Sequence, residues 1–135
     1  MNPTSIDIND MLVNESSLGL TFGTNLFIGK EPATPETCAT IFDTPGRPPL
    51  LTLEGKETTQ YYYPSIQIRV RSNSYITGWN LIHDIKVYLH GIAGEAWNGT
   101  HYDVVKCIGE PSFLDWDRND RVRFVSTYQI QRKKG

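Results

Sequence analysis

Apolar and polar residues alternate most regularly between residues 61 and 72 of the chain. Ile66, Ile68 and Val70 occupy every second position there, and polar side chains separate them. A period of two is typical of a strand with one face toward a core. A similar alternation over residues 122–130 predicts a long strand near the end of the chain, and the basic residues 131–135 after it predict a frayed tail.

Two other segments repeat apolar residues every three or four positions, which is typical of a helix with one buried face. The first predicts a short helix over residues 5–14. The second predicts a helix over residues 75–90, which Ser74 can cap and Gly91 can end. The predicted core consists of Ile66, Ile68, Val70, Trp79, Ile82, Ile85, Leu89, Phe124 and Tyr128.

Shorter apolar runs predict further strands at residues 25–28, 37–42, 102–108 and 112–115. A chain of 135 residues fits one domain. Because the helices are separated from a succession of strands, the order of elements indicates an α+β fold. We therefore expect a single domain over residues 1–135, with an antiparallel or mixed β-sheet and two helices packed on one face.

Residues 44–59 are the least regular part of the chain and are predicted to be a mobile loop. Its Pro-Gly-Arg-Pro-Pro segment, which contains Arg47, disfavours regular structure. Loops of this length are usually functional or disordered. Leu50, Leu51 and Leu53 follow, and two interpretations are open. The leucines either dock on a neighbouring subunit during assembly or pack into the subunit's own core.

The formal charge of −2 argues against general binding of polyanions. The charge is unevenly distributed, however. Residues 1–60 contain eight acidic and three basic side chains, and residues 61–135 contain seven acidic and ten basic ones. Unlike surfaces favour head-to-tail packing of identical subunits. An uneven distribution also arises by chance, so both interpretations stay open.

Motifs for catalysis and metal binding are missing from the sequence. It contains neither a phosphate-binding loop nor a dinucleotide-binding turn. His83 and His90 lie about 10 Å apart along one predicted helix, so they cannot share a metal unaided. Residues 115–126 begin like a calcium loop, but Asp120 replaces the expected glycine and Ser126 the expected glutamate. We therefore expect no enzyme, no cofactor and no metal site.

Four arginines are the main candidates for a charged surface. Arg69 and Arg71 share the polar face of one predicted strand, and Arg121 and Arg123 share a face of another. If these strands are neighbours, the guanidinium groups could contact phosphates; alternatively, they pair with acids or reach solvent. We expect these four arginines to lie at an assembly interface, together with Arg47 and the three leucines. Because no recognition helix accompanies them, we expect no reading of a specific DNA sequence.

The N-terminus lacks the basic segment and apolar run of a signal peptide. No segment is apolar over the length that a bilayer requires. These features predict a cytosolic origin and no membrane partner. Cys38 and Cys107 lie in strand-like runs and are expected to be buried thiols, with a disulfide as the alternative.

Five stretches, taken in their order and spacing, resemble the phage minor capsid and tail terminator family. They are LFIGKEPATPE (26–36), TIFDTPGRPPL (40–50), YPSIQIRVRSNSY (63–75), GEPSFLDWDRNDR (109–121) and the strand that closes the chain. In the family, a strand ending in glycine leads to a proline-bearing turn and a proline-rich loop. A strand similar to Q-x-R-V-R and a helix that starts with tyrosine follow. Pro45 is a departure, because the family more often has glycine there.

The resemblance implies a structural virion protein without a catalytic centre, at the head-proximal end of a phage tail. Such subunits form a ring, usually a hexamer, on the last ring of tail tube protein. The ring stops tube polymerisation and presents a surface to the head-side connector. Genomic DNA would pass through it, and assembly would take place in the host cytoplasm. The alternatives are a head-completion or neck protein and, from another class, a small nucleic-acid-binding module.

Overall fold

The computed structural model describes residues 1–49 and 61–134, and the predicted docking residues Leu50, Leu51 and Leu53 lie outside them. The helices of the described chain are α1 (Thr4–Asn14), the short 3-10 helix η1 (Ser16–Leu18) and α2 (Tyr75–Leu89). The strands are β1 (Leu26–Ile28), β2 (Cys38–Arg47), β3 (Tyr61–Ser72), β4 (Glu95–Trp97), β5 (Thr100–Cys107), β6 (Ser112–Trp116) and β7 (Val122–Lys134).

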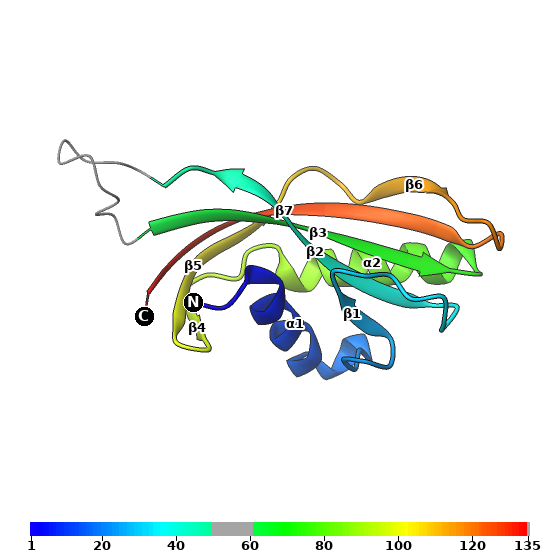
Figure 1. The fold of residues 1–135 in the computed structure, drawn as a ribbon, viewed down its shortest axis with the longest axis horizontal. Helices are drawn as coiled ribbons and strands as arrows, with labels where there is room; N and C mark the ends of the chain where they lie inside the picture. Colours follow the sequence, from blue (N-terminus) through cyan, green and yellow to red (C-terminus); the bar gives the residue numbers. More distant parts are fainter. Residues whose placement is uncertain (50–60, 135) are drawn as a thin grey trace.

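The strands form one mixed sheet in the order β1-β2-β3-β7-β5-β4, and β6 pairs with β7 beside this path. β1 runs parallel to β2, and the other pairings are antiparallel. Both α1 and α2 cover the same face of the curved sheet (Figure 1). The opposite face, called the outer face below, carries none of the described helices. The prediction of an α+β fold with a mixed sheet and two helices on one face is confirmed.

Strand β7 divides one of its edges between two partners. Its residues 122–125 pair with β6, and its residues 128–134 pair with β5. β6 therefore forms a short edge strand near one end of the molecule, and both chain termini lie toward the other end (Figure 1).

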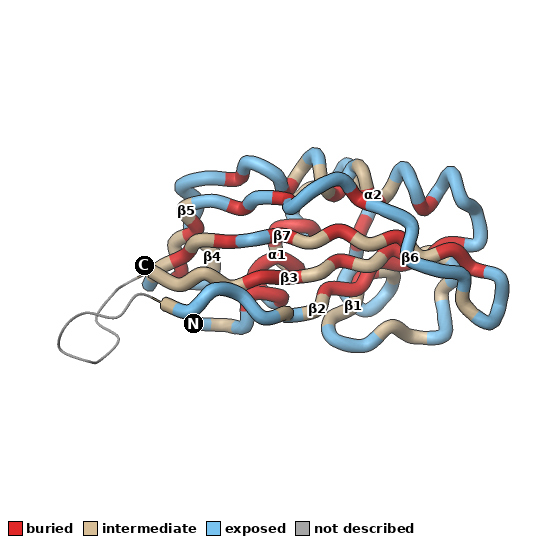
Figure 2. The backbone as a smooth tube through the Cα atoms, turned by 90° about the horizontal axis from the view of Figure 1, so that it is seen from above, coloured by how far each residue is buried: buried red, intermediate tan, exposed pale blue. Residues whose placement is uncertain are grey.

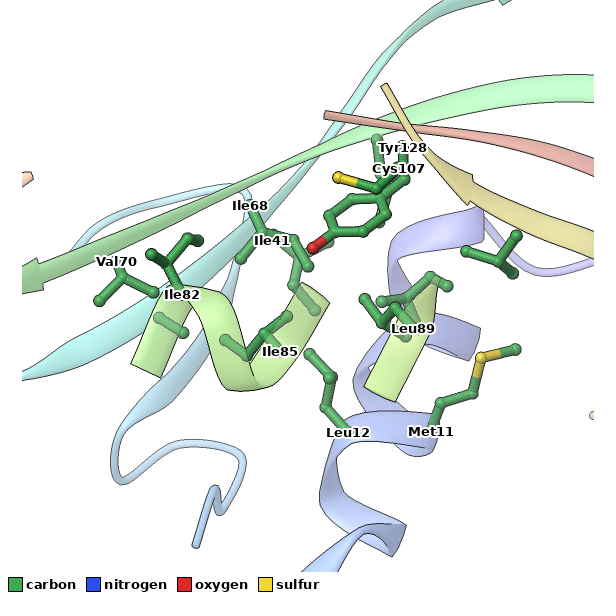
Figure 3. Close-up of a cluster of buried hydrophobic side chains, with 14 of the residues drawn as sticks. Met11, Leu12, Ile41, Ile68, Val70, Ile82, Ile85, Leu89, Cys107 and Tyr128 are labelled. Atoms are coloured by element: carbon green, nitrogen blue, oxygen red, sulfur yellow. The ribbon is translucent and has the colours of Figure 1, made fainter. Parts of the chain in front are cut away.

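The core lies between the helices and the sheet. Ile82, Ile85 and Leu89 of α2 point toward the sheet, and Met11 and Leu12 of α1 lie close to them (Figure 3). Alternate positions of two central strands complete the core: Ile66, Ile68, Val70, Phe124 and Tyr128. Solvent reaches none of these side chains. Burial of each large apolar side chain contributes about 1.5–3 kcal/mol, so this layer dominates the stability of the domain.

One predicted core residue is wrong. Trp79 has the helical spacing of the apolar stripe but is 39% exposed. Its ring packs edge-on against buried Phe124, with 5.8 Å between the ring centres, so it covers the rim of the core and does not enter it. Of the apolar stripe of α2, Ile82, Ile85 and Leu89 are buried, and Trp79 near the start of the helix is not.

Two strand ends were also predicted wrongly. β2 continues to Arg47, so residues 44–47 belong to a strand and not to a loop; a bulge interrupts its pairing there. Gly46 is required in this bulge, because a Cβ atom at this position would overlap the carbonyl oxygen of Tyr63. Residues 131–134 are not a frayed tail: they continue β7, and Arg132 is buried. The short strand β4 was not predicted.

No helix in the described ranges, 1–49 and 61–134, combines the length and apolar character needed to cross a bilayer.

Candidate assembly surface

The arginine candidates lie on the outer face, where β3 and β7 are neighbours. Arg71 lies directly across from Arg123. Arg71 is only 2% exposed, and its Nη1 atom lies 3.3 Å from Oε1 of Glu31. The same carboxylate oxygen lies 3.5 Å from Nε of Arg123. The carbonyl groups of Pro32 and Pro35 accept hydrogen bonds from Arg71 at 2.5 and 2.6 Å. Arg71 therefore fastens the loop before β2 onto the sheet.

Arg121 fastens the same loop from its other side. Its Nε atom donates a hydrogen bond of 2.7 Å to Asp117, and its Nη1 atom donates one of 2.6 Å to the carbonyl of Ala33. Burial raises the pKa of Asp117, but backbone N–H groups of Arg121 and Asn119 and the guanidinium of Arg121 outweigh it and hold that pKa below its usual range. Asp117 is therefore a persistent anionic partner for Arg121.

Two interpretations of the arginines were open, and the geometry favours pairing with acids for three of them. Arg71, Arg121 and Arg123 contact carboxylates, and the first two also donate to loop carbonyls. Arg71 uses both of its terminal nitrogens in these contacts, whereas Arg123 makes only two ion pairs, is 25% exposed and keeps donors for a further partner. Arg69 differs, because its guanidinium lies 5.0 Å from the centre of the Phe42 ring and the side chain is half-buried. A role of the four arginines in subunit contacts stays a prediction.

A second polar cluster is enclosed between α1, β5 and β7. Asp7 is completely buried and accepts hydrogen bonds from the Tyr102 hydroxyl at 2.5 Å and the Asn98 amide at 2.7 Å. Nη1 of Arg132 lies 3.7 Å from the Asp7 carboxylate and donates to the Tyr102 hydroxyl and to the carbonyl of Asn2. Burial and the hydrogen bond to Asp7 raise the pKa of Tyr102 far above its usual range. Solvent reaches neither Asp7 nor Tyr102, so this cluster anchors the end of β7 and does not meet a substrate.

Aromatic side chains gather at the end of the molecule that holds β6. Tyr75 and Trp79 contact the ring of buried Phe124 at 5.0 and 5.8 Å between centres. Phe113 lies across from Phe124 in the strand pairing, and its ring centre is 6.4 Å from that of Trp116. The members, called the aromatic patch below, are Tyr75, Trp79, Phe113 and Trp116, each between 39% and 52% exposed. Figure 2 shows that β6 is exposed along its whole length.

The outer face has a hollow of about 320 Å³ farther along β7, called the basic hollow below. Its lining consists of Arg47, Tyr63, Val104, Lys106, Gln129, Ile130 and Gln131. The guanidinium of Arg47 lies 4.5 Å from the centre of the Tyr63 ring, at the distance of a cation–π contact. Among the described residues, neither Arg47 nor Lys106 takes part in an ion pair. Both cations are therefore available to an acidic partner.

The sequence pointed to Arg47 but missed the aromatic patch. A usable signal was present, because β6 combines Phe113, Leu114 and Trp116 without the alternation of a strand that has one buried face. Large apolar residues at three of the five positions of a fully exposed strand indicate a surface that is covered in an assembly. Cys38 and Cys107 are buried and free, as expected. In the part of the chain that the structure describes, no three His, Cys, Asp or Glu side chains are grouped for metal binding.

The domain is thus an α+β subunit whose curved sheet carries an exposed, aromatic edge strand. The fold is similar to a chain of the solved structure described as "Virion of native gene transfer agent (GTA) particle", with a TM-score of 0.64. The two share 12% sequence identity, and the similarity covers 97% of this chain and 94% of that one. A search of curated protein sequences finds no match.

The sequence itself identifies the family. The model of a family described as "Bacteriophage tail terminator protein" matches residues 9–134. The chain therefore belongs to the bacteriophage tail terminator family. It is a structural protein of a phage tail.

Proposed function

We propose that this protein forms a ring at the head-proximal end of a phage tail, ends polymerisation of the tail tube and joins the tail to the head-side connector. The family match over residues 9–134 carries this proposal. The ring is a homo-oligomer, most simply a hexamer, that contacts tail tube protein on one side and connector protein on the other. It assembles in the host cytoplasm and stays in the virion.

The surface of the domain supports an assembly role. A monomeric protein rarely exposes a contiguous group of large aromatic side chains, and such groups are enriched in protein interfaces. The aromatic patch is such a group. A closed ring needs two different surfaces on each subunit, and the aromatic patch and the basic hollow provide two. Arg47 lines the second, and we place Arg69 and Arg123, which are half-buried on the outer face, at contacts as well.

Passage of DNA without sequence reading is also consistent with the domain. A chain of this length has a radius of gyration of about 14 Å, so one copy cannot enclose a duplex, whereas a ring can. The buried arginines are already paired with acids and carbonyls. Catalysis has no part in the proposal.

Tail assembly with and without the protein tests this function. In a host that produces the phage without this gene, we expect tails of uncontrolled length that do not join heads, and the gene in trans restores both properties. Electron microscopy measures tail length and head attachment. Light scattering of the purified chain with tail tubes measures the stoichiometry. Normal tails without the gene, or a monomer with salt-sensitive duplex binding, would contradict the proposal and favour a nucleic-acid-binding module.

A further inference from the structure

We infer that β6 of one subunit binds in the basic hollow of a second copy of this chain. This inference rests on the proposed ring, and it names the two surfaces that meet at the subunit interface. The ring itself does not depend on it, because other surfaces could join the subunits.

One edge of β6 has backbone groups that no described strand pairs with. β6 pairs with β7 along one edge, and no other described strand pairs with its second edge. Soluble proteins usually protect such an edge with lysine or proline, and the sequence of β6, Ser-Phe-Leu-Asp-Trp, contains neither. By contrast, the end of β2 carries Pro45, which removes a backbone donor from that edge. β6 is therefore one of the free edges of the described sheet, beside β1 and β4, and three of its five exposed side chains are large and apolar.

The side chains of β6 combine apolar area with one acidic group. Phe113, Leu114 and Trp116 are 47%, 39% and 52% exposed. Asp115 points to the outer face, where one of its oxygens lies 3.4 Å from Nε of Arg123. About half of the Asp115 side chain is still exposed, so its carboxylate can accept further hydrogen bonds.

The basic hollow offers the complementary groups. Val104 and the ring of Tyr63 supply apolar surface, and Arg47 and Lys106 supply two positive charges without a described anionic partner. Gln131 already donates to Asp103, and the exposed amide of Gln129 can donate to and accept from the unpaired backbone groups of an entering strand. A volume of about 320 Å³ suits one or two large side chains and is too small for a helix. An acidic, aromatic strand edge fits this chemistry.

These two surfaces cannot meet within one subunit. β6 pairs with residues 122–125 of β7, whereas residues 129–131 of the same strand line the hollow. The rigid strand between them keeps them apart at 3.2–3.4 Å per residue. Because both complementary surfaces belong to one chain, a second copy is the occupant, and the contact is heterologous, as a ring requires.

Disulfide trapping between two variants tests the contact. We would prepare full-length Leu114→Cys and Val104→Cys separately, mix them at the highest soluble concentration and oxidise with copper phenanthroline. A linked pair that joins residue 114 of one chain to residue 104 of another is expected only in the mixture. Wild-type protein reports any background from buried Cys38 and Cys107, and Val87→Cys mixed with Leu114→Cys is the matched control for an exposed helix position.

Charge substitution gives an independent measurement. Arg47→Glu combined with Lys106→Glu should weaken self-association at least tenfold in light scattering, and adding Asp115→Lys should recover part of it. Lys30→Glu, an exposed change outside both surfaces, should have no effect. Absence of the mixed disulfide, with or without oligomers, would overturn this contact. Failure of the wild-type protein to act on tails would instead overturn the proposed function.

Discussion

Arg71 of β3 and Arg123 of β7 lie directly across from each other, and one carboxylate oxygen of Glu31 lies within 3.5 Å of both guanidinium groups. Like charges at paired positions of neighbouring strands repel. The carboxylate that offsets this repulsion comes from the loop before β2, about forty residues from Arg71. Glu31 therefore does two things at once: it holds the loop before β2 against the sheet, and it offsets the repulsion between Arg71 and Arg123.

Replacing Glu31 by glutamine should test these two roles. Two arginines would keep their charges without their shared partner, and removing one member of a buried ion pair costs about 3–5 kcal/mol. Arg123 is partly exposed, so we expect the low end, about 3 kcal/mol, in urea unfolding. Glu36→Gln is the control, because Glu36 is mostly exposed and 3.9 Å from Arg121; it should cost under about 1 kcal/mol. Equal urea midpoints for both variants would exclude these roles.

The fold was readable from the sequence where periodicity alone decides the structure. Ile66, Ile68 and Val70 alternate and are buried, and the spacing of Ile82, Ile85 and Leu89 predicted the buried side of α2. Periodicity failed for Trp79, because the pattern of a helix does not say where the sheet beneath it ends. At Arg132 the residue type was misleading: a basic side chain near the chain end looks solvated, although its position continues the buried alternation of β7 and it is buried.

The contacts around the arginines could not be read from the sequence for a different reason. The strand pairing that brings Arg71 and Arg123 together joins positions about fifty residues apart, and the loop that covers them comes from a third segment. Nothing local marks such a long-range contact. The aromatic patch likewise depends on where β6 joins β7, so only the apolar character of β6 was visible beforehand.

Asp117 should make stability depend on pH. Its folded-state pKa is held below the unfolded value of about 4, so the ionised group stabilises the fold above that pH. This contribution disappears as the pH falls through the lower, folded-state pKa. Unfolding of Asp117→Asn, measured from pH 3 to 7, should therefore differ from wild type most at neutral pH and least at the acidic end. Asp120→Asn is the control, since asparagine tolerates the positive φ of 59° found there. A difference that is independent of pH would contradict this account.

The end of β7 should be essential for folding. Arg132→Leu would leave the buried carboxyl group of Asp7 without its cationic partner and with only the hydrogen bonds from Tyr102 and Asn98, and the loss of one member of such a pair costs about 3–5 kcal/mol. Lys134→Ala, at an exposed position two residues later, should change stability by less than about 0.5 kcal/mol. Combining Arg132→Leu with Asp7→Asn should recover part of the loss, because no buried carboxyl group is then left without its cationic partner. Chemical unfolding of wild type, Arg132→Leu, Asp7→Asn and the double variant forms a double-mutant cycle, and simple additivity of the two changes would exclude the interaction.

Gly78 should resist substitution although it lies within α2. Alanine is favoured over glycine in a helix interior by about 1 kcal/mol. A Cβ atom at position 78 would, however, lie 3.0 Å from a ring carbon of buried Phe124 and 3.2 Å from Cβ of Ser72. Because Phe124 is enclosed, we expect Gly78→Ala to lower the melting temperature. Thr77→Ala, at an exposed position of the same helix, should raise it slightly or leave it unchanged. A higher melting temperature for Gly78→Ala would show that the ring moves easily.

Trp116 should be needed for assembly but hardly for folding. Its side chain is 52% exposed, and its one ring contact among the described residues is with Phe113. Truncation to serine should therefore cost the free subunit only about 1 kcal/mol, within the range of surface aromatic contacts. The same change in an interface removes a large aromatic side chain from a covered site, where losses of 2 kcal/mol or more are common for tryptophan. We expect Trp116→Ser to keep a near-normal melting temperature while oligomer formation and tail completion fail. Val87→Ser, at a more exposed apolar position on α2, should affect neither. If Trp116→Ser assembles normally, the aromatic patch is not a subunit contact; if it unfolds, Trp116 belongs to the core.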